Sequence, residues 1–309
     1  MAQIEIVAFA NEHIEGAASV LARRHAQHRG LCALLPEIDD FIAQVRDACV
    51  DATGAVAIDG DRVVGYLLGR HAHDSIGAHI WSHVGGQAVD EPTVVQDLYA
   101  TAAARWVDEG CRRHFVFVPS IPALVEPWFK LSFGASAALA ARPSWPAPAF
   151  SAPGVTVRRV SAADMADVAR LERELYVELA ASPSFSGLRV DSVEVFEDEW
   201  RANEHDERYV AFLAETDGET VGQLFLFRRP AGDLRVPPRS IDLASASVWP
   251  EARGRGIGSA LTGTAFAWAR DNGVETVITD WRMSNLVAAR YWPARGFEET
   301  FLRLYRSIP

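Results

Sequence analysis

The stretch Val248-Trp-Pro-Glu-Ala-Arg253-Gly254-Arg255-Gly256-Ile257-Gly258-Ser259 joins a strand-like segment to a helix-like one. Residues 241–248 have the apolar pattern of a strand, and residues 256–271 have helical spacing. The three glycines permit positive φ and let the backbone approach a ligand closely. Their N–H groups and the helix N-terminus that follows form an anion site, with Arg253 and Arg255 at its rim. The stretch therefore predicts a strand–turn–helix unit that binds phosphate groups.

Other glycine-rich phosphate loops fit this stretch less well. A Walker A loop requires Lys-Ser/Thr after its last glycine, but Ser259-Ala260 follows here. A dinucleotide-binding fingerprint would place glycine or alanine at position 261, which is leucine, and its glycines would follow the strand directly. Glu275 lies near the distance at which such folds place a ribose-binding acid, so this alternative stays open.

A third pattern is Arg/Gln-x-x-Gly-x-Gly/Ala after Val-x-Pro, and residues 248–258 fit it fully. A second segment, Asn285-Leu-Val-Ala-Ala-Arg-Tyr291-Trp292-Pro-Ala-Arg-Gly296-Phe297, resembles the Asn-x-x-Ala-x-x-x-Tyr-x-x-x-Gly-Phe motif found downstream in the same family. With both motifs, residues 154–309 resemble an acyl-CoA-dependent N-acyltransferase domain of the GNAT superfamily.

The resemblance implies a mixed, strongly bent β-sheet flanked by helices, an α/β (α+β) fold. Two central strands, residues 241–248 and 275–281, are expected to splay apart and admit acetyl-CoA as cosubstrate. Its pyrophosphate would bind the amides of residues 253–259, and its pantetheine would pair with Ser247 and Val248. Asn285 would contact the coenzyme from the other side. Trp292 would pack against pantetheine or, alternatively, in the core. The residues expected to bind the coenzyme are Ser247, Val248, Arg253, Gly254, Arg255, Gly256, Ile257, Gly258, Ser259, Asn285 and Trp292.

Amine acetylation needs a base, because an amine with a pKa of about 10.4 is almost entirely protonated at neutral pH. Asp280, near the end of a strand that would border the acyl group, is the candidate base, although a solvent-facing carboxylate is an equal alternative. Asp242 and Glu251 are weaker candidates. The resemblance assigns the Val248 backbone amide as the donor to the oxyanion.

The candidate general acid departs from the family pattern. The family places a tyrosine four residues before the glycine of the Gly-Phe pair, and this chain has Trp292 there. An indole cannot release a proton at a useful pH. Tyr291 or Tyr305 is therefore expected to replace it, unless the thiolate leaves without a tyrosine acid.

The first half of the chain repeats the order of the second. The hairpin signal at Asp59-Gly60 mirrors that at Asp217-Gly218, and several residues match at an offset of 162. At that offset Glu91, Pro92, Val94 and Gln96 replace Arg253 and the three glycines. We expect a tandem layout: a degenerate GNAT-like domain at 1–137, a Pro/Ala/Ser-rich linker at 138–153 and an acyl-CoA-binding catalytic domain at 154–309.

Composition excludes several classes of function. The formal net charge of −11 argues against nucleic-acid binding, which requires a basic face. No apolar run is long enough to span a bilayer, and the sequence begins without a signal-peptide pattern, so a cytoplasmic location is expected. The three cysteines form no CxxC pair, and His71 and His73 have only Asp74 as a nearby acidic partner. No metal site is expected.

These patterns together predict an N-acetyltransferase that moves an acetyl group from acetyl-CoA to a primary amine of a small molecule. The missing tyrosine leaves a non-catalytic CoA-binding sensor or scaffold as an alternative, and a protein N-terminal amine is an alternative acceptor. The acidic segment Asp191 to Glu207 is expected to form a solvated helix or a lid near the acceptor entrance, favouring a cationic acceptor. The protein is expected to be a monomer or homodimer without nucleic-acid or membrane partners.

Overall fold

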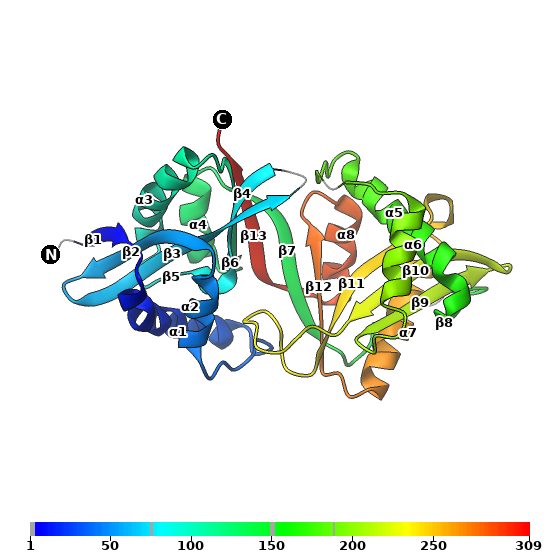
Figure 1. The fold of residues 1–309 in the computed structure, drawn as a ribbon. Helices are drawn as coiled ribbons and strands as arrows, with labels where there is room; N and C mark the ends of the chain where they lie inside the picture. Colours follow the sequence, from blue (N-terminus) through cyan, green and yellow to red (C-terminus); the bar gives the residue numbers. More distant parts are fainter. Residues whose placement is uncertain (1–3, 75–76, 149–151, 188) are drawn as a thin grey trace. The chain divides into compact units, whose positions relative to one another are not determined.

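The computed structural model describes residues 4–74, 77–148, 152–187 and 189–309, so residues 149–151 of the expected linker lie outside the described residues. The chain divides into two compact units (Figure 1). The first unit comprises Met1–Leu139, Gly232–Arg235 and Glu299–Pro309, and the second comprises Ala140–Ala231 and Val236–Glu298.

The first unit is a mixed sheet with helices beside it. Its strands are β1 (Glu5–Ala8), β2 (Ala52–Asp59), β3 (Arg62–Asp74), β4 (Gly77–Ser82), β5 (Gln87–Val89), β6 (Arg113–Pro119) and β13 (Glu298–Ser307). Its helices are α1 (Ile14–Leu31), α2 (Phe41–Ala48), α3 (Val94–Asp108) and α4 (Pro122–Lys130), with short 3-10 turns η1 (Asn11–His13) and η2 (Val84–Gly86). The strand order is β1-β2-β3-β4-β6-β13, and β5 pairs with β3. Only β4 and β6 pair in parallel; the other pairs are antiparallel.

The second unit has the same plan. Its strands are β8 (Thr156–Arg159), β9 (Tyr209–Thr216), β10 (Glu219–Phe227), β11 (Ser240–Val248) and β12 (Thr276–Arg282). Its helices are α5 (Met165–Ala180), α6 (Val193–Ala202), α7 (Ile257–Asp271) and α8 (Leu286–Tyr291), with 3-10 turns η3 (Ala162–Asp164), η4 (Pro250–Ala252) and η5 (Pro293–Arg295). The order is β8-β9-β10-β11-β12, antiparallel except for the parallel pair β11–β12. The expected fold class, a mixed α/β sheet with flanking helices, is confirmed.

Local chemistry explains where these elements begin and turn. Asp217 and Gly218 both adopt positive φ, as a two-residue hairpin turn requires, and they join β9 to β10 as the sequence predicts. Ser161 and Asp164 form a capping box at the start of the η3–α5 segment. Arg158 donates two bonds of 2.8 Å to the Asp164 carboxylate and holds the pKa of that group well below its usual range. This end of α5 is therefore fixed to β8.

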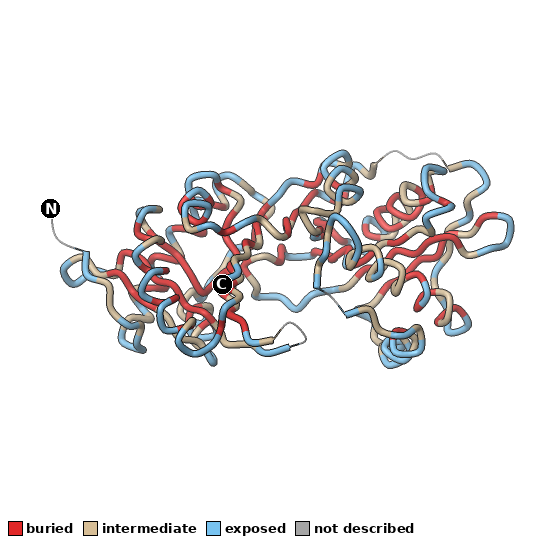
Figure 2. Tube along the Cα trace, turned by 90° about the horizontal axis from the view of Figure 1, so that it is seen from above, coloured by how far each residue is buried: buried red, intermediate tan, exposed pale blue. Residues whose placement is uncertain are grey.

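Each unit has its own apolar core, visible as buried segments along the strands in Figure 2. In the second unit the helical stripe of α5 is buried, with Val168 and Leu171 fully enclosed against Leu213 of β9. The core of the first unit gathers α1, α2 and the sheet around Tyr66 and Phe301. None of the helices in the described ranges combines the length and apolar composition needed to cross a membrane.

The ends of the compact units differ from the expected domain boundaries at two strands. The expected linker begins inside a strand, β7 (Gly134–Pro143), and β7 passes from the first unit to the second after Leu139. The last strand, β13, pairs with β6 from Phe301 opposite Pro119 to Ser307 opposite Arg113. Phe301 is fully buried in the core of the first unit, which explains why this strand belongs there. The domain boundaries at 137 and 154 remain a prediction.

Candidate functional site

The second unit opens between its two parallel strands. β11 and β12 pair over only four positions, from Ser240 opposite Thr276 to Leu243 opposite Thr279. Beyond that point both strands continue, β11 to Val248 and β12 to Arg282. The two strand ends therefore separate, as the sequence comparison with GNAT proteins led us to expect, and one edge of β11 is left without a neighbouring strand in this register.

A β-bulge marks the point of separation. Phe225 of β10 pairs with Ser245, whereas the next residue, Leu226, pairs with Leu243, so Ala244 is an extra residue in β11. A bulge bends its strand and increases the local twist. It thereby turns the last part of β11 away from β12.

The Val248 amide faces the opened edge. The Trp249 N–H donates to the Val221 carbonyl on the β10 side at 3.0 Å. Because successive residues of a strand direct their N–H groups to opposite edges, the N–H of Val248 is directed away from β10. This is the orientation that an oxyanion donor in the opening requires.

The glycine turn leads directly into the first turn of α7. Gly254 and Gly256 have φ of +78° and +81°, and Gly256 caps the helix without a side-chain bond. The first intrahelical bond runs from Ala260 N–H to the Gly256 carbonyl at 3.0 Å. The amides of residues 257–259 therefore lie in the first helical turn, where N–H groups have no partner within the helix. The Ile257 side chain points inward and is buried.

The arginines at the rim differ in their surroundings. The Arg253 guanidinium donates to the Val248 carbonyl at 3.1 Å and to the Glu178 carboxylate at 2.5 Å. Arg255 is exposed. Part of the positive charge at the turn is thus balanced by α5, and the Arg255 side chain remains accessible to an anion.

Side chains of the second motif, residues 285–297, contact α7. Asn285 caps α8, its Oδ1 accepting from Val287 N–H and Ala288 N–H at 3.1 Å each. The Tyr291 hydroxyl shares a 2.8 Å hydrogen bond with Thr262 and lies 3.3 Å from the position a Cβ on Gly258 would take.

Arg295 and Trp292, which follow α8, make further side-chain contacts. The Arg295 guanidinium stacks on the Tyr291 ring and donates to the Ser259 hydroxyl at 2.6 Å. Trp292 is 7% exposed and packs edge-to-face against Phe297. Core packing is therefore observed for Trp292, and a contact with pantetheine remains a prediction.

The candidate bases lie in different surroundings. Asp280 is exposed on β12 and interacts electrostatically with Arg282, its neighbour on the same strand face. Burial lowers the pKa of Arg282, which also lies close enough to Tyr176 to interact with it. Asp242 is 2% exposed and paired with Arg229, so its carboxylate is already neutralised. Glu251 is exposed in the turn η4.

One polar cluster was not identified from the sequence. Glu172 of α5 accepts hydrogen bonds from the Gln223 side-chain amide and the Ser245 hydroxyl, each at 2.8 Å. Burial raises the pKa of Glu172, and the nearby Glu199 carboxylate raises it further, although the two hydrogen bonds act in the opposite direction. Burial also raises the pKa of Tyr176, one helical turn along α5. The available signal was a glutamate four residues after Val168, on the apolar stripe of the helix.

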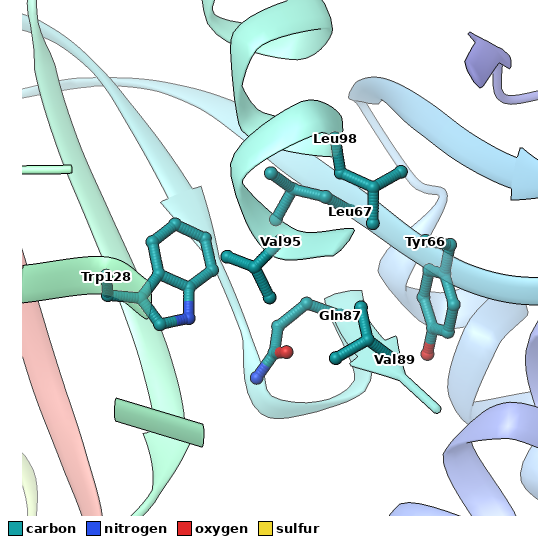
Figure 3. Close-up of a pocket in the computed structure, with 7 residues that line it drawn as sticks. All are labelled: Tyr66, Leu67, Gln87, Val89, Val95, Leu98 and Trp128. Carbon is teal, nitrogen blue, oxygen red and sulfur yellow. The ribbon is translucent and has the colours of Figure 1, made fainter. Parts of the chain in front are cut away.

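The first unit treats the equivalent positions differently. In this unit η2 lies between β4 and β5. The Gln87 side chain of β5 donates to the Phe117 carbonyl of β6 at 3.0 Å. Figure 3 shows a small apolar pocket around this glutamine, and it has no room for a small-molecule ligand. The residues that line this pocket are Tyr66, Leu67, Gln87, Val89, Val95, Leu98 and Trp128.

No metal site accompanies these features in the described ranges, where no three His, Cys, Asp or Glu side chains are grouped closely enough to hold an ion.

Two parallel strands that separate at a bulge, beside a glycine turn that leads into a helix, are typical of an N-acetyltransferase fold. A family model described as Acetyltransferase (GNAT) family matches residues 173–297. Aminoglycoside N(6′)-acetyltransferase type 1 of Stenotrophomonas maltophilia is 34% identical over 108 residues, covering 34% of this chain and 69% of that protein. The chain belongs to the GNAT acetyltransferase family.

Other relatives match over shorter parts or by fold alone. A mycothiol acetyltransferase of Sanguibacter keddieii is 38% identical over 97 residues, which span 31% of this chain and 30% of that protein. A GCN5-related N-acetyltransferase from Sphaerobacter thermophilus has a TM-score of 0.63 at 14% identity, covering 98% of this chain and 95% of that one. A tandem GNAT protein from the clavulanic acid biosynthesis pathway has a TM-score of 0.54 at 15% identity, covering 99% and 98%.

The raised pKa of Glu172 predicts a pH-dependent effect on stability. A carboxyl group whose pKa is higher in the folded protein than in the unfolded chain weakens folding as pH rises between those two values. The neutral, nearly isosteric Glu172→Gln removes this penalty and keeps an oxygen that can accept from Gln223 or Ser245. We expect the melting temperature of Glu172→Gln, relative to wild type, to rise as pH increases from 4.5 to 8. A variant destabilised equally at every pH would contradict this.

Proposed function

We propose that this protein is an acetyl-CoA-dependent N-acetyltransferase that acts on a primary amine of a small molecule. The observation that carries the proposal is the separation of β11 from β12 beside the donor-rich start of α7. An open strand edge can pair with the pantetheine amides, and free N–H groups at a helix N-terminus favour the pyrophosphate. Both features lie in the part of the chain that the family model matches.

The coenzyme would be held mainly by backbone groups. In this proposal the pyrophosphate binds the amides of residues 254–259, with Arg253 and Arg255 adding charge. The pantetheine lies along β11 beside Ser247 and Val248, with Asn285 and Trp292 on the α8 side. The Asn285 Oδ1 serves as a helix cap, which leaves its amide nitrogen as the donor for a ligand. Bound acetyl-CoA supplies the thioester that carries the acetyl group.

The chemistry requires a neutral amine, an oxyanion donor and a proton for the thiolate. Raising the neutral fraction of an amine with a pKa of about 10.4 at pH 7 is worth roughly 4.6 kcal/mol. We assign Asp280 to accept a proton from the ammonium group, after which the nitrogen forms a bond to the thioester carbon, the C–S bond breaks, and the further proton that the nitrogen loses protonates the leaving thiolate. The Val248 N–H would stabilise the oxyanion. The general-acid role of Tyr291 remains a prediction, and its bond to Thr262 is one that proton transfer would have to interrupt.

The acceptor class is supported by the relatives. Their names are aminoglycoside N(6′)-acetyltransferase and mycothiol acetyltransferase, and both matches overlap only part of this chain. A small-molecule amine is therefore the acceptor that we propose. The interaction of Tyr176 with Glu172 and Glu199 adds an acidic environment suited to a cationic amine.

We also propose that the first unit is a degenerate copy that does not bind coenzyme. Helix α3 begins after Thr93 where α7 begins after Gly256, one residue from the alignment expected from the sequence. Aligned on these caps, Asp90 replaces Arg253, and its carboxylate is paired with Arg23 at 2.9 Å. The bond from Gln87 to Phe117 spans the strands that separate in the second unit. One coenzyme site per chain follows from this proposal.

A CoA-binding sensor without turnover is the second candidate. Its support is Trp292, which replaces the family's tyrosine and is buried against Phe297. Binding of acetyl-CoA without transfer to any amine would favour this candidate over the enzyme.

Coenzyme binding is tested by Gly256→Val, with Gly273→Val as a matched control. Both glycines have positive φ and lie at opposite ends of α7, so each substitution should cost a similar 1–2 kcal/mol, roughly, in folding. Only Gly256→Val adds a side chain at the proposed pyrophosphate site. We expect calorimetry to find one acetyl-CoA site in wild type and in the control, and more than about tenfold weaker binding in Gly256→Val. Equal binding by both variants would contradict the assignment.

The base is tested by Asp280→Asn. We expect kcat for an amine acceptor to fall by about 100-fold or more at pH 7, since general base catalysis contributes about 10²–10⁴-fold. The loss should shrink at high pH, where more of the amine is already neutral. The control is Glu275→Gln, which changes an exposed carboxylate immediately before the start of β12. An unchanged rate and pH profile in Asp280→Asn would remove Asp280 from the mechanism.

A further inference from the structure

A polar cluster links three elements of the second unit close to the β11 bulge. The Glu172 carboxylate of α5 accepts from the Gln223 side chain of β10 and from the Ser245 hydroxyl of β11. The Gln223 amide nitrogen also lies 3.3 Å from the Ser245 hydroxyl. Ser245 directly follows the bulged Ala244, so the cluster lies where β11 leaves β12.

Two polar atoms of this region have no hydrogen-bond partner within the described structure. They are the Gln223 Oε1 and the Ser247 Oγ. Gln223 is 0% exposed and Ser247 is 8% exposed, so neither atom is compensated by bulk water. A buried polar atom without a hydrogen-bond partner destabilises the fold, which makes each of them a candidate partner for a bound ligand. Ser247 and Ser245 alternate along β11 and therefore lie on the same face of the sheet.

Glu172 as a residue is partly exposed, although burial of its carboxylate raises the pKa of that group. Its charged neighbours are Glu199 of α6 and, through Tyr176, Asp191 and Arg282. Among these groups Arg282 interacts electrostatically with Asp280, and Asp191 pairs with Arg189, so the charges of Glu172 and Glu199 are left uncompensated by them. The side of the opening near Glu172 therefore has an excess of negative charge and of acceptor atoms.

We propose that Glu172, Gln223 and Ser247 form a subsite for an ammonium group of the acceptor. An ammonium group has three N–H donors and no acceptor, and the cluster offers a carboxylate, an amide oxygen and a hydroxyl oxygen. Binding would neutralise the Glu172 charge and satisfy both unpartnered atoms at once. A neutral hydroxyl group could donate only one of these bonds.

This subsite is separate from the position assigned to the reacting amine. Asp280 lies on β12, whereas Glu172, Gln223 and Ser247 belong to α5, β10 and β11. Tyr176 interacts electrostatically with Glu172 and with Arg282, and Arg282 in turn interacts with Asp280. The acceptor class is therefore a small molecule with at least two cationic amines, one held at Glu172 and the other reacting at Asp280. This inference rests on the proposed function and adds the substrate class to it.

The test measures binding without turnover. Diamines from diaminopropane to diaminooctane, and the amino alcohols of matching length, are titrated by calorimetry into protein saturated with CoA. The variants are wild type, Glu172→Gln, Ser247→Ala and the control Glu174→Gln, which changes the same charge two residues along α5 and therefore on another face of the helix. A melting curve of each variant establishes that it is folded.

We expect wild type and Glu174→Gln to bind the best diamine about tenfold or more tightly than its amino alcohol, as a partly buried charge pair allows. Glu172→Gln should remove this preference while its acetyl-CoA affinity stays unchanged, and Ser247→Ala should reduce the preference. A preference retained in folded Glu172→Gln, or the absence of any diamine preference in wild type, would overturn the subsite. Failure of wild type to bind acetyl-CoA would instead overturn the proposed function.

Discussion

The function proposed for this chain depends on the early end of the pairing between β11 and β12. The strands share four residue pairs, and then Ala244 bulges and the two strand ends diverge. A sheet edge opened in this way carries unsatisfied N–H and C=O groups, which an extended ligand with amide bonds can satisfy. The turn that follows β11 leads directly into α7, so the same few residues provide a free strand edge and a helix N-terminus. The roles proposed for Asp280 and for the Glu172 cluster both depend on this opening.

The two units share a strand plan but differ at the positions that would form such a site. Both have an antiparallel hairpin, a third antiparallel strand and a parallel strand reached through a helix. In the first unit the helix cap is Thr93 rather than a left-handed glycine, and Asp90 is held by Arg23 near it. The Gln87 side chain bonds to the neighbouring strand. A side-chain donor there satisfies the Phe117 backbone carbonyl from within the unit.

The sequence predicted those structural features that depend on residues close together in the chain. The glycine turn, the hairpin at Asp217-Gly218 and the helical stripe of α5 were all evident, because positive φ and helical periodicity leave direct marks in a sequence. The membership of β13 in the first unit was not, since the apolar alternation of a strand does not specify its partner. The Glu172 cluster joins α5 to β10 and β11, residues about 50 and 70 positions apart, and a single sequence carries no record of such contacts. The general acid also stayed open, because Trp292 stands at the family's tyrosine position and the sequence does not show whether Tyr291 or Tyr305 replaces it.

The most direct test of the account is a crystal structure of the protein with CoA. The account predicts one CoA per chain, its pyrophosphate within hydrogen-bonding distance of the amides of residues 254–259 and its pantetheine amides paired with β11 near Val248. The thiol end should then lie at the bulge, between Asp280 and the Glu172 cluster. CoA bound elsewhere, or β11 and β12 closed along their whole length in the complex, would contradict the central claim.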